Sequence, residues 1–249
     1  MKLRAIEVLE DRSSASRCDE GFLRVARLTL RNVYEEGVSE AYACDVVSRP
    51  GSDAVVAVLY ARQPSGGVTV LLRDAPRAPI YLRRFKRFEH PDEREYLTLT
   101  EVVAGLIEAG DGGGDAGLRR CAAREAREEA GVACLEDAFS VIGGETFASP
   151  GTSDEKVFYA AAPVRLDEAR APHGDGSVME EAARLVRRGL ADAIAACRRG
   201  EIPDMKTEVA LLRLADHLGF LPQLDCFADE LPAELRARYR RLGVEGLPA

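Results

Sequence analysis

The sequence predicts an α+β fold, because segments patterned like strands and segments composed like helices both occur along the chain. Two apolar runs, 54–60 and 68–72, flank the turn-forming Pro64-Ser65-Gly66-Gly67, which predicts a buried hairpin. Residues 116–130 are rich in Ala, Arg, Leu and Glu, which predicts a helix. A chain of 249 residues with 46% hydrophobic residues can bury a core. It is either one elaborated domain or one domain with a smaller companion.

The remaining elements follow from local patterns. Residues 23–31 alternate apolar and polar side chains, the period of a strand with one solvated face, so 22–47 is expected to be β-rich. Gly200 and Gly219 predict the ends of two late helices. The other expected elements are strands at 96–103, 134–147 and 157–164, loops at 110–114 and 148–154, and helices at 190–199, 205–218 and 232–242.

The charge balance excludes a nucleic acid as the main partner. The formal net charge is -8, and backbone phosphates are neutralised by clustered Lys and Arg. The six cysteines include no CxxC pair and the chain has only three histidines, so a structural zinc site is not expected. We find no leader and no membrane span in the pattern, and expect a cytoplasmic protein with reduced thiols and no membrane partner.

The segment 83–95 has two interpretations. It is dense in charge and includes Arg83-Arg84-Phe85-Lys86-Arg87-Phe88. A solvated loop and a basic rim for phosphate both fit this composition.

Three glutamates on the predicted helix 116–130 are candidate metal ligands, and an ordinary solvent-facing helix is the alternative interpretation of the same pattern. Residues advance by roughly 100° along a helix, so Glu125 and Glu129 lie one turn apart on one face, with Glu128 beside them. Like charges at this spacing repel, and either Arg124 and Arg127 or a divalent metal would compensate them. Hard oxygen ligands of this kind favour Mg²⁺ or Mn²⁺.

These residues resemble the signature of the Nudix hydrolases. That signature runs Gly, five residues, Glu, seven residues, then Arg-Glu-apolar-any-Glu-Glu-any-Gly-apolar, and its second half is matched from Arg124 to Val132. If Gly105 is its first glycine, Asp111 stands where Glu is expected and a glycine-rich insertion precedes the helix. The other alignment places Gly110 at the first glycine and Ala116 at the Glu; we favour Gly105.

The resemblance extends to the ADP-ribose and nucleotide-sugar pyrophosphatase branch over roughly 55–218. Residues 101–106 are similar to its Glu-apolar-Pro-Ala-Gly-Leu run, with Val103 in place of Pro. Residues 147–155 are similar to its loop after the signature, and 204–207 to its Asp-Ala-Lys-Thr entry to the last helix. The resemblance implies an α/β/α sandwich with a mixed sheet, a β-rich region at 1–50 that helps form a homodimer, a hydrolase domain at 51–219 and a helical extension at 220–249.

The resemblance also implies a site. Two or three Mg²⁺ would be held by the carbonyl of Ala104 and the carboxylates of Glu125 and Glu129, with Glu128 assisting. The general base is expected from Glu180 and Glu181, for which a simple helix start is an alternative, or from Glu155. The expected contacts to the substrate are Arg77, Arg73, Glu101, Ser149 and Gly151. For the charged residues among them, a simple surface charge is the alternative.

The function implied is hydrolysis of the pyrophosphate bond of a nucleoside diphosphate linked to a sugar. ADP-ribose is the first expectation, giving AMP and ribose 5-phosphate, followed by other nucleotide sugars such as UDP- or GDP-sugars. The alternative is a Nudix-fold protein that binds or senses a nucleotide sugar without cleaving it, which the replaced first Glu and the insertion favour. The intact Glu125, Glu128 and Glu129 favour the enzyme.

Overall fold

The computed structural model describes residues 3–11, 22–64, 66–170 and 183–241, and these divide into two compact units. The first unit is Met1–Ala54 with Thr146–Val157, and the second is Val55–Glu145 with Phe158–Ala249. The first unit is therefore built from two separate stretches of the chain. Each unit is described on its own below.

The first unit is a small antiparallel sheet centred on β2. In the described residues β1 and β3 pair with β2, and β4 pairs with β2 over seven positions, from Arg24↔Ser48 to Leu30↔Tyr42. The amide of Val47 also donates to the carbonyl of Thr152 at 2.7 Å, which joins the two stretches of this unit. The strands are β1 (Leu3–Asp11), β2 (Arg24–Tyr34), β3 (Gly37–Val38), β4 (Tyr42–Ser48) and β10 (Thr146–Phe147), which pairs with the first residues of β11 (Lys156–Pro163).

The second unit is built on a sheet in which β11, β5, β6 and β12 are neighbours in that order. The predicted hairpin is confirmed, since β5 and β6 pair antiparallel with Tyr60 opposite Val70. The described strands are β5 (Ala54–Arg62), β6 (Val68–Ala75), β7 (Leu99–Glu101) beside β6, β8 (Val103–Leu106) beside β5, β9 (Ser140–Val141) beside β11, β11 (Lys156–Pro163) and β12 (Arg184–Gly189).

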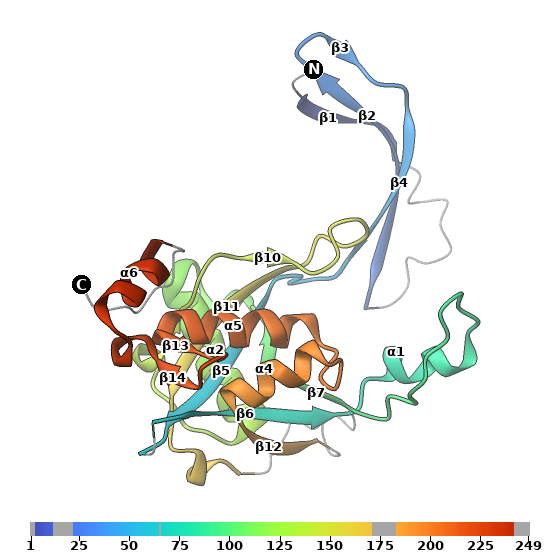
Figure 1. Ribbon diagram of the computed structural model, residues 1–249. Helices are drawn as coiled ribbons and strands as arrows, with labels where there is room; N and C mark the ends of the chain where they lie inside the picture. The colour runs from blue at the N-terminus through green and yellow to red at the C-terminus, as the bar shows by residue number, and fades with distance from the viewer. Residues whose placement is uncertain (1–2, 12–21, 65, 171–182, 242–249) are drawn as a thin grey trace. The chain divides into compact units, whose positions relative to one another are not determined.

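Helices cover both faces of this sheet. Alternate residues of β5, such as Val55, Ala57 and Leu59, share one core cluster with helix α2, whereas α4 and α5 lie in front of the sheet in Figure 1. The first seven residues of β5 are buried without interruption, as expected for a strand covered on both faces. The mixed α/β architecture expected from the sequence is confirmed. The longer helices are α2 (Gly114–Ala130), α4 (Leu190–Arg198), α5 (Met205–Leu218) and α6 (Ala233–Arg241).

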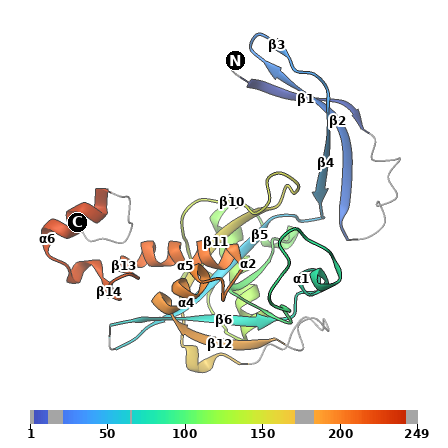
Figure 2. The same ribbon diagram turned by 45° about the vertical axis from the view of Figure 1, so that its right-hand side comes forward.

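Short elements complete the second unit. Figure 2 shows the C-terminal segment continuing from α5 through the small pair β13 and β14 to α6. These elements are α1 (Ala78–Tyr81), η2 (Leu82–Phe85), η3 (Ala109–Asp111), η4 (Glu136–Ala138), η5 (Leu166–Glu168), β13 (Phe220–Leu221), β14 (Cys226–Phe227) and η6 (Ala228–Glu230).

The strand predicted at 134–147 is wrong over most of its length. Only the short β9 and β10 form there, and η4 occupies the start. Phe139 and Ile142 are nevertheless buried, and the amide of Ile142 donates to the carbonyl of Tyr159 at 2.9 Å. The apolar side chains of this segment thus enter the core without a continuous ladder of strand hydrogen bonds. Among the described residues, no helix has both the length and the apolar character needed to cross a bilayer.

Candidate active site

Helix α2 positions the glutamates. It begins after Gly113 and ends at Gly131, which adopts the left-handed conformation (φ 62°) that glycine tolerates. The apolar and small residues of its inner face pack in the core cluster, and Glu125 and Glu129 lie on the buried side with them. Each of these two residues is less than 8% exposed. Two buried carboxylates one turn apart need nearby positive charge or donors.

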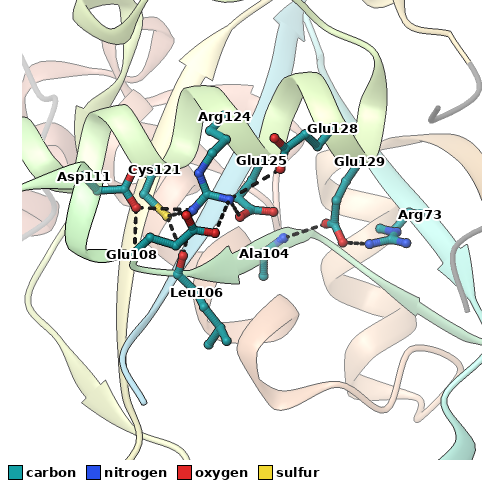
Figure 3. A network of polar contacts seen from close by, with 10 residues as sticks. All are labelled: Arg73, Ala104, Leu106, Glu108, Asp111, Cys121, Arg124, Glu125, Glu128 and Glu129. Carbon is teal, nitrogen blue, oxygen red and sulfur yellow. Dashed lines mark hydrogen bonds and ion pairs between the residues drawn. The ribbon is translucent and has the colours of Figure 1, made fainter. Parts of the chain in front are cut away.

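Arg73 supplies a positive charge to Glu129, and Ala104 supplies a hydrogen-bond donor. The guanidinium of Arg73, on β6, forms an ion pair with the Glu129 carboxylate, and both side chains are buried. The amide of Ala104, on β8, donates to Glu129 Oε2 at 3.1 Å. In Figure 3, Glu129 lies between these two groups. Three of the predicted site residues therefore meet at one point of the fold.

Gly105 makes room for Glu125. A Cβ atom added to Gly105 would overlap the Glu125 carboxylate, so this position excludes every side chain while that rotamer is kept. A glycine is therefore needed on β8 where the helix brings its glutamate against the strand. This close approach supports Gly105, rather than Gly110, as the first glycine of the signature, since nothing lies within 4 Å of a Cβ built on Gly110.

Arg124 is the centre of a polar network on the other side of Glu125. Its guanidinium lies 2.5 Å from Glu125 Oε1 and donates to the carbonyl of Leu106 at 2.8 Å. The network is drawn in Figure 3. Its further ion pairs are with Asp111 at 3.2 Å, Glu128 at 3.4 Å and Glu108 at 3.5 Å. Arg124 thus compensates the glutamates as expected, whereas Arg127 is exposed and forms no ion pair with a described residue.

Asp111 fixes the loop before the helix. Its carboxylate accepts from Arg124 and from the amide of Glu108 at 2.8 Å, and the side chain is buried. The aspartate at the position of the expected Glu therefore makes a charged contact to the arginine of the signature. The insertion that follows, with Gly112 and Gly114 at positive φ, leads from this contact into the first turn of the helix. The spacing of the signature placed Asp111 at the position of the expected Glu, but it did not predict the contact with Arg124.

Burial and charge shift the pKa values of two groups here. Burial alone would lower the pKa of Arg124, but Glu125 and Asp111 raise it overall, so this guanidinium stays charged. Cys121 lies beside Arg124, and its thiol donates to the carbonyl of Leu106 at 3.4 Å. Burial, with a smaller contribution from Glu125, raises the pKa of Cys121 to about 12. This thiol is a packing group and not a nucleophile.

Arg77 and Glu101 form a second pair of predicted site residues. Arg77 precedes α1 and Glu101 ends β7, and their side chains form an ion pair in which Glu101 is buried and Arg77 is 42% exposed. Glu101 stands opposite Arg73 in the pairing of β7 with β6. The sheet register therefore links this pair to the contact between Arg73 and Glu129.

The other predicted residues lie in the first unit or outside the described residues. Glu155 forms an ion pair with Arg49 at 2.8 Å. The hydroxyls of Ser149 and Thr152 are 2.8 Å apart, in the turn that contains Gly151. Glu180 and Glu181 lie outside the described residues, so their predicted role as general base has no structural counterpart here.

Thr207 supports the strand that leads into the site, and sequence reasoning missed this role. Its hydroxyl accepts from the amide of Val102 at 2.9 Å and donates to Asp204 at 2.7 Å. Asp204 also caps α5 by accepting from the amide of Thr207. Thr207 is fully buried. The Asp-x-x-Thr spacing predicts a helix cap, but the contact to Val102 depends on the tertiary fold.

The donor chemistry of this site suits a divalent cation, because such ions bind carboxylate and carbonyl oxygens. Glu129 presents its carboxylate to the Ala104 backbone, and Glu125 and Glu128 present theirs to Arg124. As drawn, no group of three or more His, Cys, Asp or Glu side chains in the described part of the chain is arranged to hold a metal. The guanidinium groups of Arg73 and Arg124 provide the positive charge next to these carboxylates.

The chain is similar to known proteins named as a pyrophosphatase and a hydrolase. No protein-family model matches the chain. The chain is 29% identical over 148 residues to a GDP-mannose pyrophosphatase from Pectobacterium atrosepticum, covering 58% of this chain and 70% of that protein. Its fold is similar to a crystal structure of an ADP compounds hydrolase, with a TM-score of 0.57, 15% sequence identity, and coverage of 88% of this chain and 95% of the other.

The signature on α2, the sheet and helices around it, and these relatives make the chain similar to the Nudix hydrolases. Within that superfamily it resembles the branch of ADP-ribose and nucleotide-sugar pyrophosphatases.

Proposed function

We propose that the protein hydrolyses the pyrophosphate bond of a nucleoside diphosphate linked to a sugar, using Mg²⁺ or, as a substitute, Mn²⁺. ADP-ribose is the first substrate we expect, and GDP- and UDP-sugars are the next. The names of the two relatives, a GDP-mannose pyrophosphatase and an ADP compounds hydrolase, support this substrate class. The observation that carries the proposal is the pair of buried carboxylates, Glu125 and Glu129, held against β8 at Ala104 and Gly105.

The residues that would hold the metal are Glu125 and Glu129 with the carbonyl of Ala104, and Glu128 would assist them. When bound, Mg²⁺ neutralises the diphosphate and lowers the pKa of a water molecule. Arg124 orients Glu125 and Glu128 by the contacts described above. Arg73 holds Glu129 in the same way. The guanidinium groups of Arg73 and Arg124 therefore hold the carboxylates of the site in place.

The reaction needs little beyond positioning and charge. The oxygen of a water forms a bond to one phosphorus, and the bridging P–O bond breaks, so that ADP-ribose gives AMP and ribose 5-phosphate. Arg77, the more exposed partner of the buried Glu101, is the cation we assign to a substrate phosphate or base. Glu101, Ser149 and Gly151 are the further substrate contacts in this proposal. The proton acceptor is assigned to Glu180 or Glu181, with Glu155 as the second choice.

We also propose that the enzyme is a cytoplasmic homodimer. All five described cysteines are free, which is consistent with a reducing compartment. Large apolar side chains of the first unit, including Phe22, Leu23 and Val38, are more than half exposed, which supports a partner surface there. Size-exclusion chromatography with light scattering tests the oligomeric state directly.

Product analysis of the purified full chain tests the proposed activity. ADP-ribose, nucleotide sugars, dinucleoside polyphosphates and nucleoside triphosphates are incubated with Mg²⁺ and without metal. The variant Glu129→Gln removes one proposed ligand while keeping side-chain size, and Glu234→Gln, an exposed glutamate of α6, is the matched control. We expect cleavage of a diphosphate-linked sugar by the native chain and by Glu234→Gln only.

Two results would change the assignment. Unchanged turnover in a folded Glu129→Gln protein would end the metal assignment of this residue. A nucleotide sugar that binds in Mg²⁺ but is recovered intact after long incubation would favour the sensing protein instead of the enzyme.

A further inference from the structure

A cavity lined by both charged and apolar side chains lies beside helix α2. Its volume is about 490 Å³, and it is formed by α2 together with the segment 133–136. At roughly 100° per residue, Arg120 stands about 180° around the helix from Glu129. The cavity is therefore on the opposite side of the helix from the Arg73–Glu129 pair. Asp111 and Arg124 of the polar network form one wall of it.

Two arginines of this cavity have no acidic partner. Arg120 and Arg127 are exposed, and neither forms an ion pair with any described residue, unlike Arg124 between them. The three residues are spaced i, i+4 and i+7, so their side chains line one stripe of the helix. Two guanidinium groups with their donors unused on one wall suit an anion with several acceptor oxygens.

The glycine-rich insertion contributes to this arrangement. The Arg120 guanidinium reaches back to Gly112, where its Nη2 atom lies 3.9 Å from the position of an added Cβ. Gly112 has a positive φ of 75° and carries no side chain that would fill this space. Gly112, the first residue of the insertion, therefore lies next to Arg120 and leaves the exposed Arg120 head group accessible.

The segment 133–136 forms a further wall, which is largely apolar and carries one acid. Leu135 is 80% exposed at the cavity, Ala133 adds a small apolar surface, and Ala123 adds another from α2. Glu136 lies beside them and forms no ion pair with a described residue. A carboxylate accepts hydrogen bonds from hydroxyl groups. The wall thus suits a small organic group with hydroxyls, and the cavity is larger than a phosphate alone requires.

We propose that this cavity is a second ligand site, which binds the phosphate group of a phosphorylated sugar between Arg120 and Arg127 and its hydroxyls at Glu136. The proposal does not depend on the proposed hydrolysis, because both arginines lie outside the glutamate site. An occupant would stand next to Arg124, the residue that also holds Glu125. Inorganic phosphate shares the same charged chemistry and is the alternative source of the anion.

Calorimetric titration of the full chain in EDTA tests this site without metal-dependent binding. The probes are ribose 5-phosphate and inorganic phosphate. The double variant Arg120→Gln/Arg127→Gln removes both proposed anion contacts. Arg198→Gln is the matched control, because Arg198 is also an exposed arginine in the last turn of a helix. Arg77→Gln reports on binding at the proposed substrate site instead.

We expect ribose 5-phosphate to bind the native chain, Arg198→Gln and Arg77→Gln alike. Losing two charge-assisted contacts should weaken binding to the double variant by about 100-fold or more. Glu136→Gln should weaken the sugar phosphate and leave inorganic phosphate unchanged. Equal binding of both probes, unaffected by Glu136→Gln but lost in the double variant, would assign the site to phosphate itself.

The proposal fails if neither probe binds the native chain at millimolar concentration. It also fails if the double variant binds as tightly as the native chain, or if Arg77→Gln alone abolishes binding. Circular dichroism of each variant confirms that the fold is kept, and the exposed positions of the substituted side chains make this the expected result.

Discussion

Arg73 and Glu129 form a buried ion pair that joins strand β6 to helix α2. The two residues lie 56 positions apart in the chain, so their contact depends on the tertiary fold and not on local structure. Pairs of this kind cost free energy when one partner is removed, because the remaining charge stays buried. Glu129 therefore has two roles: it neutralises the buried Arg73, and it is a proposed metal ligand.

The Arg73–Glu129 pair gives the first prediction. Arg73→Met should lower the free energy of unfolding by about 3–5 kcal/mol, because it leaves the Glu129 carboxylate buried without its cation. Arg73→Met/Glu129→Leu should recover most of that loss, since no charge is then buried. Urea denaturation of both variants and of Glu129→Leu completes the cycle. A double variant no more stable than Arg73→Met would contradict this account.

Gly105→Ala should abolish activity and destabilise the fold. The added Cβ overlaps the Glu125 carboxylate, so the helix or the glutamate must move. We expect a loss of about 1–3 kcal/mol, the usual cost of overpacking. Gly110→Ala is the control, because nothing lies within 4 Å of the added atom. Thermal melting and turnover are measured on both variants, and equal behaviour would show that Glu125 adjusts freely.

Asp111→Asn should weaken the network around Arg124 while keeping a side chain of nearly the same size at this position. The amide keeps one acceptor oxygen but loses the charge that faces Arg124, and the hydrogen bonds involved are of the stronger, charge-assisted kind. We expect a loss of about 1.5–3 kcal/mol by denaturant titration. Asp115→Asn, an exposed residue of the first turn of α2, should change stability by less than about 0.5 kcal/mol. Equal losses of stability in Asp111→Asn and Asp115→Asn would show that the charge of Asp111 does not stabilise the network.

Thr207→Val should destabilise the second unit although the volume is nearly conserved. It removes the acceptor for the buried amide of Val102 and one donor to Asp204. An unsatisfied buried group costs about 1–3 kcal/mol. Hydrogen exchange should then increase at Val102, and Thr207→Ser should restore its protection. Unchanged exchange in Thr207→Val would show that the Val102 amide has another partner.

The pKa of Cys121 predicts a loss of stability at high pH. This pKa is raised from 9.0 to about 12 in the folded chain, mainly by burial. The unfolded thiol ionises near pH 9 while the folded one stays protonated, so the stabilisation is complete below pH 9 and is lost between pH 9 and about 12. Burial also raises the pKa of Cys197, to about 11, in the same direction.

Cys121→Ala should therefore flatten the pH dependence of the free energy of unfolding between pH 9 and 11. The comparison concerns the slope, because the substitution also removes packing volume. Alkylation at pH 9 should label Cys121 only after unfolding. Parallel slopes for the two proteins would rule out a contribution from this thiol.

Local signals predicted the helices well. Helix α5 spans Met205–Leu218 as expected, because an aspartate caps its start and Gly219 ends it in the left-handed conformation. Helix α2 begins two residues before the predicted position, within the glycine-rich insertion. The strand expected from residue 96 begins only at Leu99, since Tyr96 has a positive φ of 46° and is not extended.

The site was predicted in type but not in its contacts. The helical period placed Glu125 and Glu129 on one face, and the structure places both against β8. The partners Arg73 and Asp111 come from distant or looped segments, and their contacts depend on how the strands meet the helix. The hydrophobic period of a segment describes one helix or strand at a time, so it carries no information about contacts between elements.

The chain passes through the first unit twice. Because residues 146–157 belong with 1–54, the second stretch is held in part by the hydrogen bond between Val47 and Thr152. A protein shortened at residue 55 would keep the stretch 146–157 but lose its partner strand. The cut would leave the Thr152 carbonyl without its donor, and removing 146–157 as well would take away Lys156 and Val157, the start of β11. Shorter forms of the protein should therefore keep residues 1–54.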